Sequence, residues 1–182
     1  MNKLNEMVSI IIPVLNEGES IQQLYSEIKQ NVAGFPRYEI VFVDDGSTDD
    51  SLQVIESLKL SDSNVKLIQF YKNYGKAEAL SAGFNDCQGD YVITMDADLQ
   101  DDPNEINALV NKLKEGWDVV SGWKKSRNDP LSKKFPSKIF NLITRLFTGI
   151  QIHDFNCGLK AYRSSVVKSI ELYGGLHRYI PA

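Results

Sequence analysis

Five carboxylic acids follow an apolar run in the stretch YVITMDADLQDDPNEI, residues 91–106. Side chains alternate along an extended strand, so Asp96 and Asp98 project to the same side if that geometry continues through them. Two carboxylates held close together repel each other, which favours a positive group between them. Mg²⁺ and Mn²⁺ prefer such hard oxygen ligands, with phosphates completing the shell. We therefore predict a divalent-cation site at Asp96 and Asp98, with the amide oxygen of Gln100 as a further ligand.

The remaining acids of this stretch suit the start of a helix. Asp101 and Asp102 come just before Pro103, and proline is well placed in the first turn of a helix. Negative charge is favourable at the positive end of a helix dipole. We predict that Asp101 and Asp102 are capping residues and not metal ligands, and that Glu105 is an ordinary surface residue.

Other types of site fit the spacing less well. Counted from Asp96, an EF-hand requires Gly and Glu where this chain has Asp101 and Asn107. The glycine-rich patterns of dinucleotide sites and P-loops do not occur in the sequence. A phosphohydrolase with an aspartyl nucleophile in a D-x-D motif stays open, although such a motif normally follows the first strand and here it follows the fourth.

Apolar, β-rich runs alternate with segments of helical periodicity along the chain. Strands are predicted over residues 8–12, where Pro13 ends the run, over 38–43, from 65, over 90–95 and within 117–122; helices are predicted over 20–32, after 49 or 50, over 76–87 and from 103. This alternation predicts a doubly wound α/β domain with a mostly parallel sheet. Ligands of such sheets bind beyond the carboxyl ends of the strands, where Asp44 and Asp45 join Asp96 and Asp98.

The composition is that of an ordinary globular domain. The chain has 182 residues, 42% of them hydrophobic, and a net charge of -4, which argues against a nucleic-acid-coating or disordered protein. No apolar run approaches the ~20 residues needed to span a bilayer, and the run from Met7 is too short for a signal peptide. We predict that Cys87 and Cys157 are free thiols in or near the core, as in a reducing compartment.

The charge is unevenly distributed. Between Lys124 and Arg145 there are seven basic residues and one acid, Asp129. Apolar residues at spacings of three and four predict a basic amphipathic helix over residues 129–148. This helix either packs on the domain with its lysines reaching into water, or lies at a membrane surface or polyanionic substrate. The last residues, LYGGLHRYIPA, carry no capping signal, which predicts that the natural chain continues.

Five motifs together resemble a known family. VSIIIPVLNEGESI, EIVFVDDGSTDDS, NYGKAEALSAGF, GDYVITMDADLQDDP and DFNCGLKAYR occur in this order. In order and spacing they resemble the inverting family 2 glycosyltransferases of the GT-A fold, in particular the subgroup of dolichyl-phosphate mannose synthase and the polyprenyl-phosphate glycosyltransferases. The resemblance implies one catalytic domain over residues 1–182, truncated at its C-terminus. Its nucleotide-binding part is expected at about 7–122 and its acceptor side at about 123–182.

The resemblance also implies a UDP- or GDP-sugar donor, an Mg or Mn cofactor and a set of binding residues. In the family, a metal at the D-x-D motif neutralises the charge on the leaving diphosphate. Lys124 or Arg127 stands in for an arginine that many relatives carry after the fifth strand. The expected donor-binding residues are Pro13, Glu17, Asp44, Asp45, Lys76, Asp96, Ala97, Asp98, Gln100, Lys124 and Arg127. The alternative for Asp44 and Asp45 is a turn-and-cap sequence, although two adjacent acids exceed what a turn needs. Lys76 reads equally as a residue at a helix start.

Asp154 matches the position at which the family places a carboxylate near the acceptor. The resemblance therefore implies that Asp154 is the catalytic base or orients the acceptor, with a buried structural acid as the alternative. A polyprenyl phosphate is the expected acceptor, used at the cytoplasmic face of a membrane, with no role for nucleic acid. Three alternatives stay open. The acceptor could be a soluble glycan or cell-surface polysaccharide, or the chain could be a donor-binding module without turnover. The third is a nucleotidyltransferase, although the glycine-rich loop expected of that class is missing from this sequence. The sequence leaves the sugar and the oligomeric state open.

Overall fold

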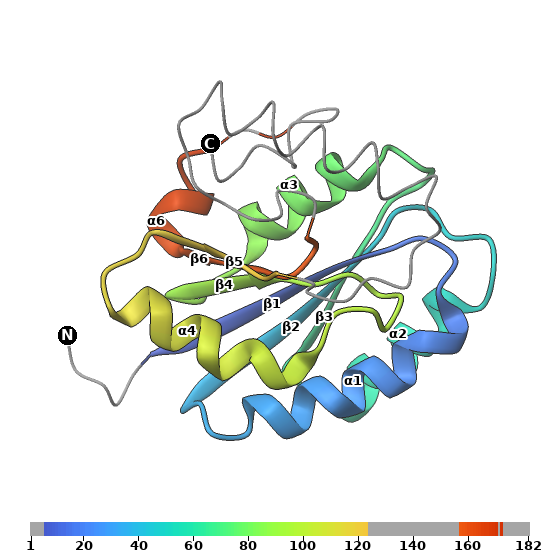
Figure 1. Ribbon diagram of the computed structural model, residues 1–182. Helices are drawn as coiled ribbons and strands as arrows, with labels where there is room; N and C mark the ends of the chain where they lie inside the picture. The colour runs from blue at the N-terminus through green and yellow to red at the C-terminus, as the bar shows by residue number, and fades with distance from the viewer. Residues whose placement is uncertain (1–5, 124–156, 171, 173–182) are drawn as a thin grey trace, which may run out of the picture.

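The structure is a computed structural model that describes residues 6–123, 157–170 and 172. One six-stranded sheet forms its centre, with helices on both faces (Figure 1). The strands lie in the order β3-β2-β1-β4-β6-β5. Their bounds are β1 Met7–Val14, β2 Arg37–Asp44, β3 Val65–Gln69, β4 Tyr91–Thr94, β5 Val119–Ser121 and β6 Lys160–Arg163. The strands β1 to β4 pair in parallel, whereas β6 is antiparallel to both β4 and β5.

The helices cover the sheet in two layers. One face carries α1 (Gly18–Val32), α2 (Ser51–Ser61) and α4 (Ile106–Lys114), which continues from the short 3₁₀ helix η2 (Pro103–Glu105); the other carries α3 (Lys76–Asp86) and α6 (Ser164–Val167). Each layer buries its own cluster of side chains, because residues of a strand alternate between faces. Ile10, Ile12, Phe42 and Ile93 belong to the first cluster, and Ile11, Val41, Val43 and Val92 to the second. The predicted mostly parallel α/β fold is confirmed.

The first strand extends beyond its predicted end. Pro13 lies within β1, which continues to Val14. The carbonyl of Ile11 faces β4 and accepts a hydrogen bond from the Met95 N–H at 3.1 Å. Two residues further on, Pro13 faces the same side, beyond the last residue of β1 that pairs with β4. The missing N–H of proline therefore costs no ladder hydrogen bond, which is the condition under which proline is tolerated in a strand.

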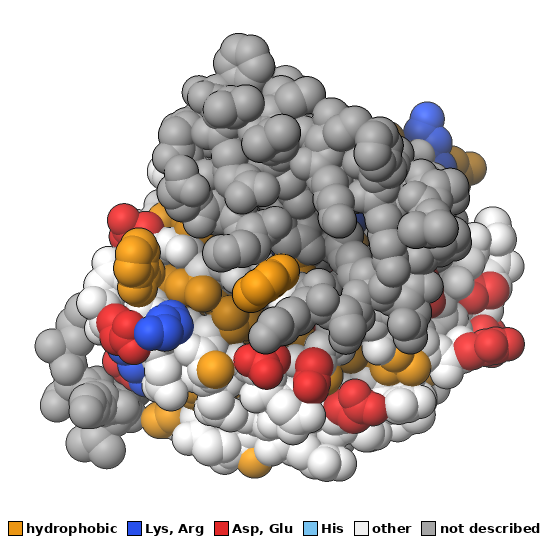
Figure 2. Space-filling model, in the orientation of Figure 1, with side chains coloured by type: hydrophobic (Ala, Val, Ile, Leu, Met, Phe, Trp, Pro, Cys, Tyr) orange, Lys and Arg blue, Asp and Glu red, His pale blue; other side chains and the backbone are white. Residues whose placement is uncertain are grey.

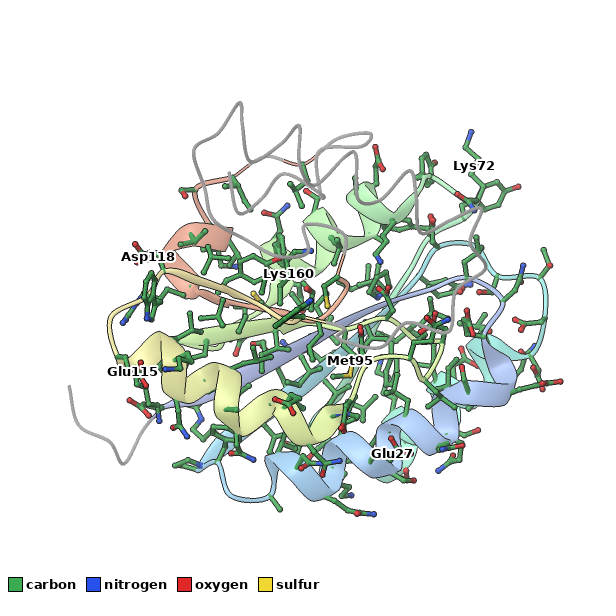
Figure 3. The ribbon with its side chains drawn as sticks, viewed as in Figure 1. Glu27, Lys72, Met95, Glu115, Asp118 and Lys160 are labelled. Atoms are coloured by element: carbon green, nitrogen blue, oxygen red, sulfur yellow. The ribbon has the colours of Figure 1, made fainter. Side chains whose placement is uncertain are left out.

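The strand β6 was not predicted. It comes from the motif DFNCGLKAYR and lies between β4 and β5, so that β5 contacts the sheet only through β6. Ala161 and Tyr162 are buried, and Lys160, also buried, lies on β6 in the middle of the molecule (Figure 3). Just after α6, the Lys168 Nζ donates to carbonyls at the end of α3 at 2.6, 2.9 and 3.0 Å. The C-terminal segment thus joins the sheet and one helix layer.

The remaining predictions concern the cysteines, membrane spans and the basic helix. Cys87 and Cys157 are buried and form no disulfide, as expected. In Figure 2, acidic side chains are spread over the described surface of the face shown. No helix among the described residues is long and apolar enough to cross a membrane. The basic helix predicted over residues 129–148 lies outside the described part of the chain.

Candidate functional site

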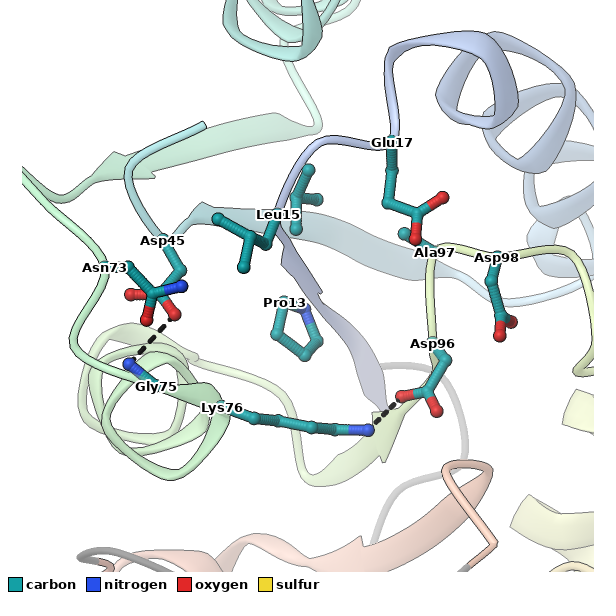
Figure 4. A pocket seen from close by; sticks show the side chains of 11 residues that line it. Pro13, Leu15, Glu17, Asp45, Asn73, Gly75, Lys76, Asp96, Ala97 and Asp98 are labelled. Carbon is teal, nitrogen blue, oxygen red and sulfur yellow. Dashed lines mark hydrogen bonds and ion pairs between the residues drawn. The ribbon is translucent and has the colours of Figure 1, made fainter. Parts of the chain in front are cut away.

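A cavity of about 270 Å³ opens at the carboxyl ends of β1, β2 and β4 (Figure 4). From β1 the chain winds outward to β2 and β3 on one side, while β4 lies on the other side of β1. The cavity therefore lies at the point where the strand order reverses, which is where open α/β sheets bind their ligands. Its lining consists of Pro13, Val14, Leu15, Glu17, Asp45, Asn73, Gly75, Lys76, Asp96, Ala97 and Asp98.

Most of the predicted donor-binding residues within the described chain line this one cavity. The exceptions are Asp44 and Gln100. Asp44 is buried, and its carboxylate accepts a hydrogen bond from the Ser47 N–H at 3.2 Å, within the turn that follows β2. Gln100 is exposed, and its backbone N–H donates to Asp98 at 3.1 Å. The structure brings neither side chain into the cavity lining, so their assignment to the donor or metal stays a prediction.

Asp45 fixes the turn that precedes α3. Its two carboxylate oxygens accept hydrogen bonds from the backbone N–H groups of Tyr74 and Gly75, at 2.7 and 2.9 Å. The side chain is buried, and because the acceptor is a carboxylate, these hydrogen bonds are charge-assisted and strong. Gly75 has a φ of 109°, a conformation that glycine adopts readily. This turn brings Asn73, Gly75 and the first residue of α3, Lys76, to the cavity.

Lys76 reaches across the cavity below Pro13 and forms an ion pair with Asp96 (Figure 4). The two side chains are 38% and 28% exposed, so the pair is accessible to a ligand. Asp96 follows the last residue of β4 by two positions, so its carboxylate lies beyond the carboxyl end of that strand. The Asp96 carboxylate of the D-x-D motif therefore pairs with a positively charged side chain, and the divalent cation between Asp96 and Asp98 stays a prediction.

The backbone of the D-x-D loop is held by Asp101. The Asp101 side chain is 4% exposed and accepts a hydrogen bond from the Asp96 N–H at 3.0 Å. The prediction that Asp101 caps the following helix is therefore wrong, because its carboxylate turns back into the loop. Asp102 does cap η2, through the Asn104 N–H at 2.9 Å. Between Asp98 and Gln100 the chain has an unusual conformation, with a φ of 60° at Leu99, and such backbone strain clusters at functional loops.

The loop after β1 is tied to the loop after β2. The Glu17 N–H donates to the Ser51 hydroxyl at 2.8 Å, and the Gly18 N–H donates to Asp49 at 3.0 Å. Asn16, with a φ of 56°, accepts from the Thr48 N–H at 2.8 Å. These bonds hold Glu17 at the cavity, where its carboxylate accepts from Ser20 at 3.2 Å.

Sequence reasoning missed several residues of the site. Asn73 and Gly75 line the cavity although only Lys76 of their motif was singled out; their position directly before the helix start could have indicated them. Conversely, Lys124, Arg127 and the candidate catalytic Asp154 lie outside the described residues. Their roles stay predictions.

The cavity fits a divalent cation that is held jointly with a ligand. Asp96 and Asp98 supply hard oxygen atoms. The Lys76 ammonium forms an ion pair with one of these oxygens, Oδ1 of Asp96. Within the described chain, no group of three or more His, Cys, Asp or Glu side chains gathers as a metal site. Mg²⁺ and related ions commonly use one or two carboxylates together with substrate phosphates, and the two aspartates match that arrangement.

The fold and the position of this cavity are those of an open α/β sheet that binds its ligand where the strand order reverses, and comparisons with known proteins show the family. The family model described as glycosyl transferase family 2 matches residues 9–171, and the chain belongs to this family. It is 35% identical to a dodecaprenyl-phosphate galacturonate synthase of Rhizobium johnstonii, over 96% of this chain and 53% of that protein. It is 41% identical to an undecaprenyl-phosphate 4-deoxy-4-formamido-L-arabinose transferase of Pseudomonas syringae, over 91% and 50%. The chain thus spans about half the length of these curated relatives.

Solved structures share the fold. A glucosyl-3-phosphoglycerate synthase of Mycobacterium tuberculosis, in complex with UDP, has a TM-score of 0.73 and 22% identity, over 92% of this chain and 60% of that one. A mannosyltransferase of Pyrobaculum calidifontis, in complex with GDP-Man and Mn²⁺, has a TM-score of 0.67 and 21% identity, over 92% and 47%. The GT-A fold inferred from the motifs is confirmed.

Proposed function

We propose that this chain is the catalytic part of a metal-dependent, inverting glycosyltransferase that moves a hexose from a UDP- or GDP-sugar to a polyprenyl phosphate. The observation that carries the proposal is the shared cavity of Asp96, Asp98, Asp45 and Lys76 at the reversal of the strand order. The names of the relatives, which refer to dodecaprenyl and undecaprenyl phosphate, support a lipid phosphate as acceptor.

The cavity residues divide the work of binding the donor. Glu17 offers carboxylate oxygens to ribose or base hydrogen-bond donors, and the Asp45 oxygens retain acceptor capacity beside their two backbone bonds. Lys76 contacts the diphosphate once a ligand enters between it and Asp96. When bound, the Mg²⁺ or Mn²⁺ ion would be held by Asp96 and Asp98, with Gln100 as a further ligand, and would neutralise charge on the leaving diphosphate.

The acceptor side rests on residues outside the described chain. Inversion requires attack from the face of the sugar opposite the diphosphate, and Asp154 is the proposed acceptor-orienting group. A lipid phosphate is already anionic near pH 7, so it needs orientation more than deprotonation. The basic segment between Lys124 and Arg145 supports attachment to the cytoplasmic face of a membrane, because each basic side chain gains about 1 kcal/mol near anionic lipid. Lys124 and Arg127 add positive charge for the phosphates.

Calorimetry tests the donor and metal parts of the proposal. UDP and GDP are titrated into wild type and Asp98→Asn, with and without Mn²⁺. We expect Mn²⁺ to strengthen binding of one nucleotide to the wild type, and Asp98→Asn to lose that gain. Asp102→Asn is the matched control, because Asp102 is exposed and caps η2 without lining the cavity. Nucleotide binding that ignores both metal and Asp98→Asn contradicts the proposal.

The acceptor is tested separately with a radiolabelled donor and a polyprenyl phosphate. We expect label to pass into the organic phase in a metal-dependent way. A water-soluble labelled glycan instead supports a soluble or cell-surface polymer as acceptor. Metal-dependent binding of the donor without any transfer by the 182-residue chain supports a donor-binding module.

A further inference from the structure

We propose that Gly158 is a positioning residue for the carboxylate of Asp96, an assignment that rests on the proposed metal site. Gly158 lies two residues before β6, and its carbonyl accepts a hydrogen bond from the Thr94 hydroxyl on β4 at 2.8 Å. A Cβ atom added to Gly158 would lie 2.5 Å from both Cγ and Oδ2 of Asp96, and 2.7 Å from Oδ1. The Asp96 carboxylate therefore occupies the space that any side chain at position 158 would need.

Space, and not backbone conformation, is what requires glycine here. Gly46, Gly75 and Gly116 have positive φ angles, whereas Gly158 does not. The left-handed conformation that disfavours alanine at those three glycines is thus absent at Gly158. The three nearest atoms to its Cβ all belong to the side chain of Asp96. The closest clash of an added side chain is therefore with this carboxylate.

Asp96 is confined from three directions. Asp101 holds its backbone N–H, Lys76 holds Oδ1, and the backbone of Gly158 closes off the space behind the carboxylate. Metal ligands work only when their orientation is fixed by the surrounding groups. Because β6 pairs with β4 through Thr94 and Lys160, the C-terminal segment sets the position of a ligand that belongs to the D-x-D motif.

An alanine at position 158 must displace the carboxylate. The Asp96 side chain is 28% exposed, so it can rotate into the cavity at a modest cost in stability. Gly83 provides a contrast, since its added Cβ would lie 2.5 Å from Cγ2 of the buried Ile11. We expect Gly158→Ala to lose metal affinity with a small change in Tm, and Gly83→Ala to lower Tm strongly.

Mn²⁺ binding in the presence of UDP or GDP, followed by electron paramagnetic resonance, tests the assignment. We expect Gly158→Ala to raise the Kd of Mn²⁺ about tenfold to a hundredfold, as for other changes to the surroundings of metal ligands. Gly34→Ala is the matched control, because nothing lies within 4 Å of its added Cβ and its φ is not positive. Equal Mn²⁺ affinity of the two variants would overturn the assignment.

A double-mutant cycle separates positioning from general damage. If Gly158 acts through Asp96, adding Gly158→Ala to Asp96→Ala does not lower Tm further, because the clashing carboxylate is gone. The same double variant answers the question if Gly158→Ala alone fails to fold. A double variant that folds supports the contact, and one that does not fold overturns the assignment.

The wild type and Asp96→Asn distinguish this inference from the proposed function. If Mn²⁺ binds the wild type and Asp96→Asn abolishes that binding, the metal site stands, and the comparison of Gly158→Ala with Gly34→Ala decides the positioning role alone. If the wild type binds no Mn²⁺ with either nucleotide, the metal proposal fails, and the positioning role is overturned with it.

Discussion

Lys76 lies where its charge acts directly on the carboxylate of Asp96. The ammonium forms an ion pair with that carboxylate, and it lies between the D-x-D motif and the turn held by Asp45. If a metal and a diphosphate bind, Asp96 would contact the metal and Lys76 would contact the diphosphate. Lys76 would then pass from Asp96 to the phosphates, so it would compete with the metal before the donor binds and support the donor afterwards.

Exchange of this lysine should therefore have two opposite effects. We expect Lys76→Gln to strengthen Mn²⁺ binding without nucleotide by about two- to fivefold, since exposed ion pairs contribute roughly 1 kcal/mol or less. It should weaken Mn²⁺-dependent binding of UDP or GDP, because the diphosphate loses a cationic contact. Isothermal titration measures both. Lys72→Gln is the control, since Lys72 projects outward from the same loop, over the ring of Tyr74 (Figure 3); equal results for the two variants contradict the role of Lys76.

At the scale of elements, α1 and α2 are joined by a buried acid. Asp62, which follows α2, accepts hydrogen bonds from the Tyr25 hydroxyl at 2.8 Å and the Asn64 N–H at 2.9 Å, and lies 3.0 Å from the Lys29 Nζ. Burial raises the pKa of Asp62, but the hydrogen bonds from Asn64, Lys29 and Tyr25 outweigh burial and lower the pKa to about 2. The ionised form is thus favoured in the folded chain.

This lowered pKa predicts a pH dependence of stability. Asp62 contributes stability above its unfolded pKa of about 3.9, and that contribution is lost as the pH falls from about 4 to about 2. Between pH 5 and pH 2 we expect the free energy of unfolding of the wild type to fall on the order of 1–2 kcal/mol more than that of Asp62→Asn. Urea unfolding followed by circular dichroism measures it. Asp118→Asn, at a 76% exposed side chain, should behave like the wild type.

At the scale of the whole molecule, the segment 157–170 completes the sheet. β6 separates β4 from β5, and Cys157, Leu159, Ala161 and Tyr162 are buried. The Arg163 guanidinium donates to the carbonyls of Leu113 and Trp117 near the end of α4, at 2.5 and 3.1 Å. The end of the described chain therefore supports both layers of helices, although every residue that lines the cavity belongs to the first hundred residues.

A fragment of residues 1–123 should consequently fail to fold as the full chain does. Without β6, β4 becomes an open edge and β5 loses its partner. We expect the fragment to unfold over a broad temperature range, or to aggregate, where the full chain unfolds cooperatively. Thermal circular dichroism and light scattering measure this. A fragment with the midpoint and steepness of the full chain would show that β6 is dispensable.

Much of the fold and part of the site could be predicted from local patterns. Apolar runs and helical periodicity placed β1 to β5 and the helices α1 to α4, because burial on two faces leaves a direct signature in sequence. β6 escaped prediction because its four residues, KAYR, begin and end with basic side chains. Lys160 is buried and donates to the Cys157 carbonyl. Lysine is mostly exposed in proteins, so its residue type does not predict this environment.

The sequence by itself determined that acids follow β2 and β4, and that a cation is the chemistry that suits them. Only the tertiary structure decided that Asp45 faces the cavity while Asp44 turns inward, since neighbouring residues point to opposite sides and the sequence does not say which side is open. It likewise decided that Asp101 holds the D-x-D loop and that Gly158 closes the space behind Asp96. The physical reason is that composition and periodicity report local burial, whereas the position of a carboxylate depends on strands and loops that are distant in sequence.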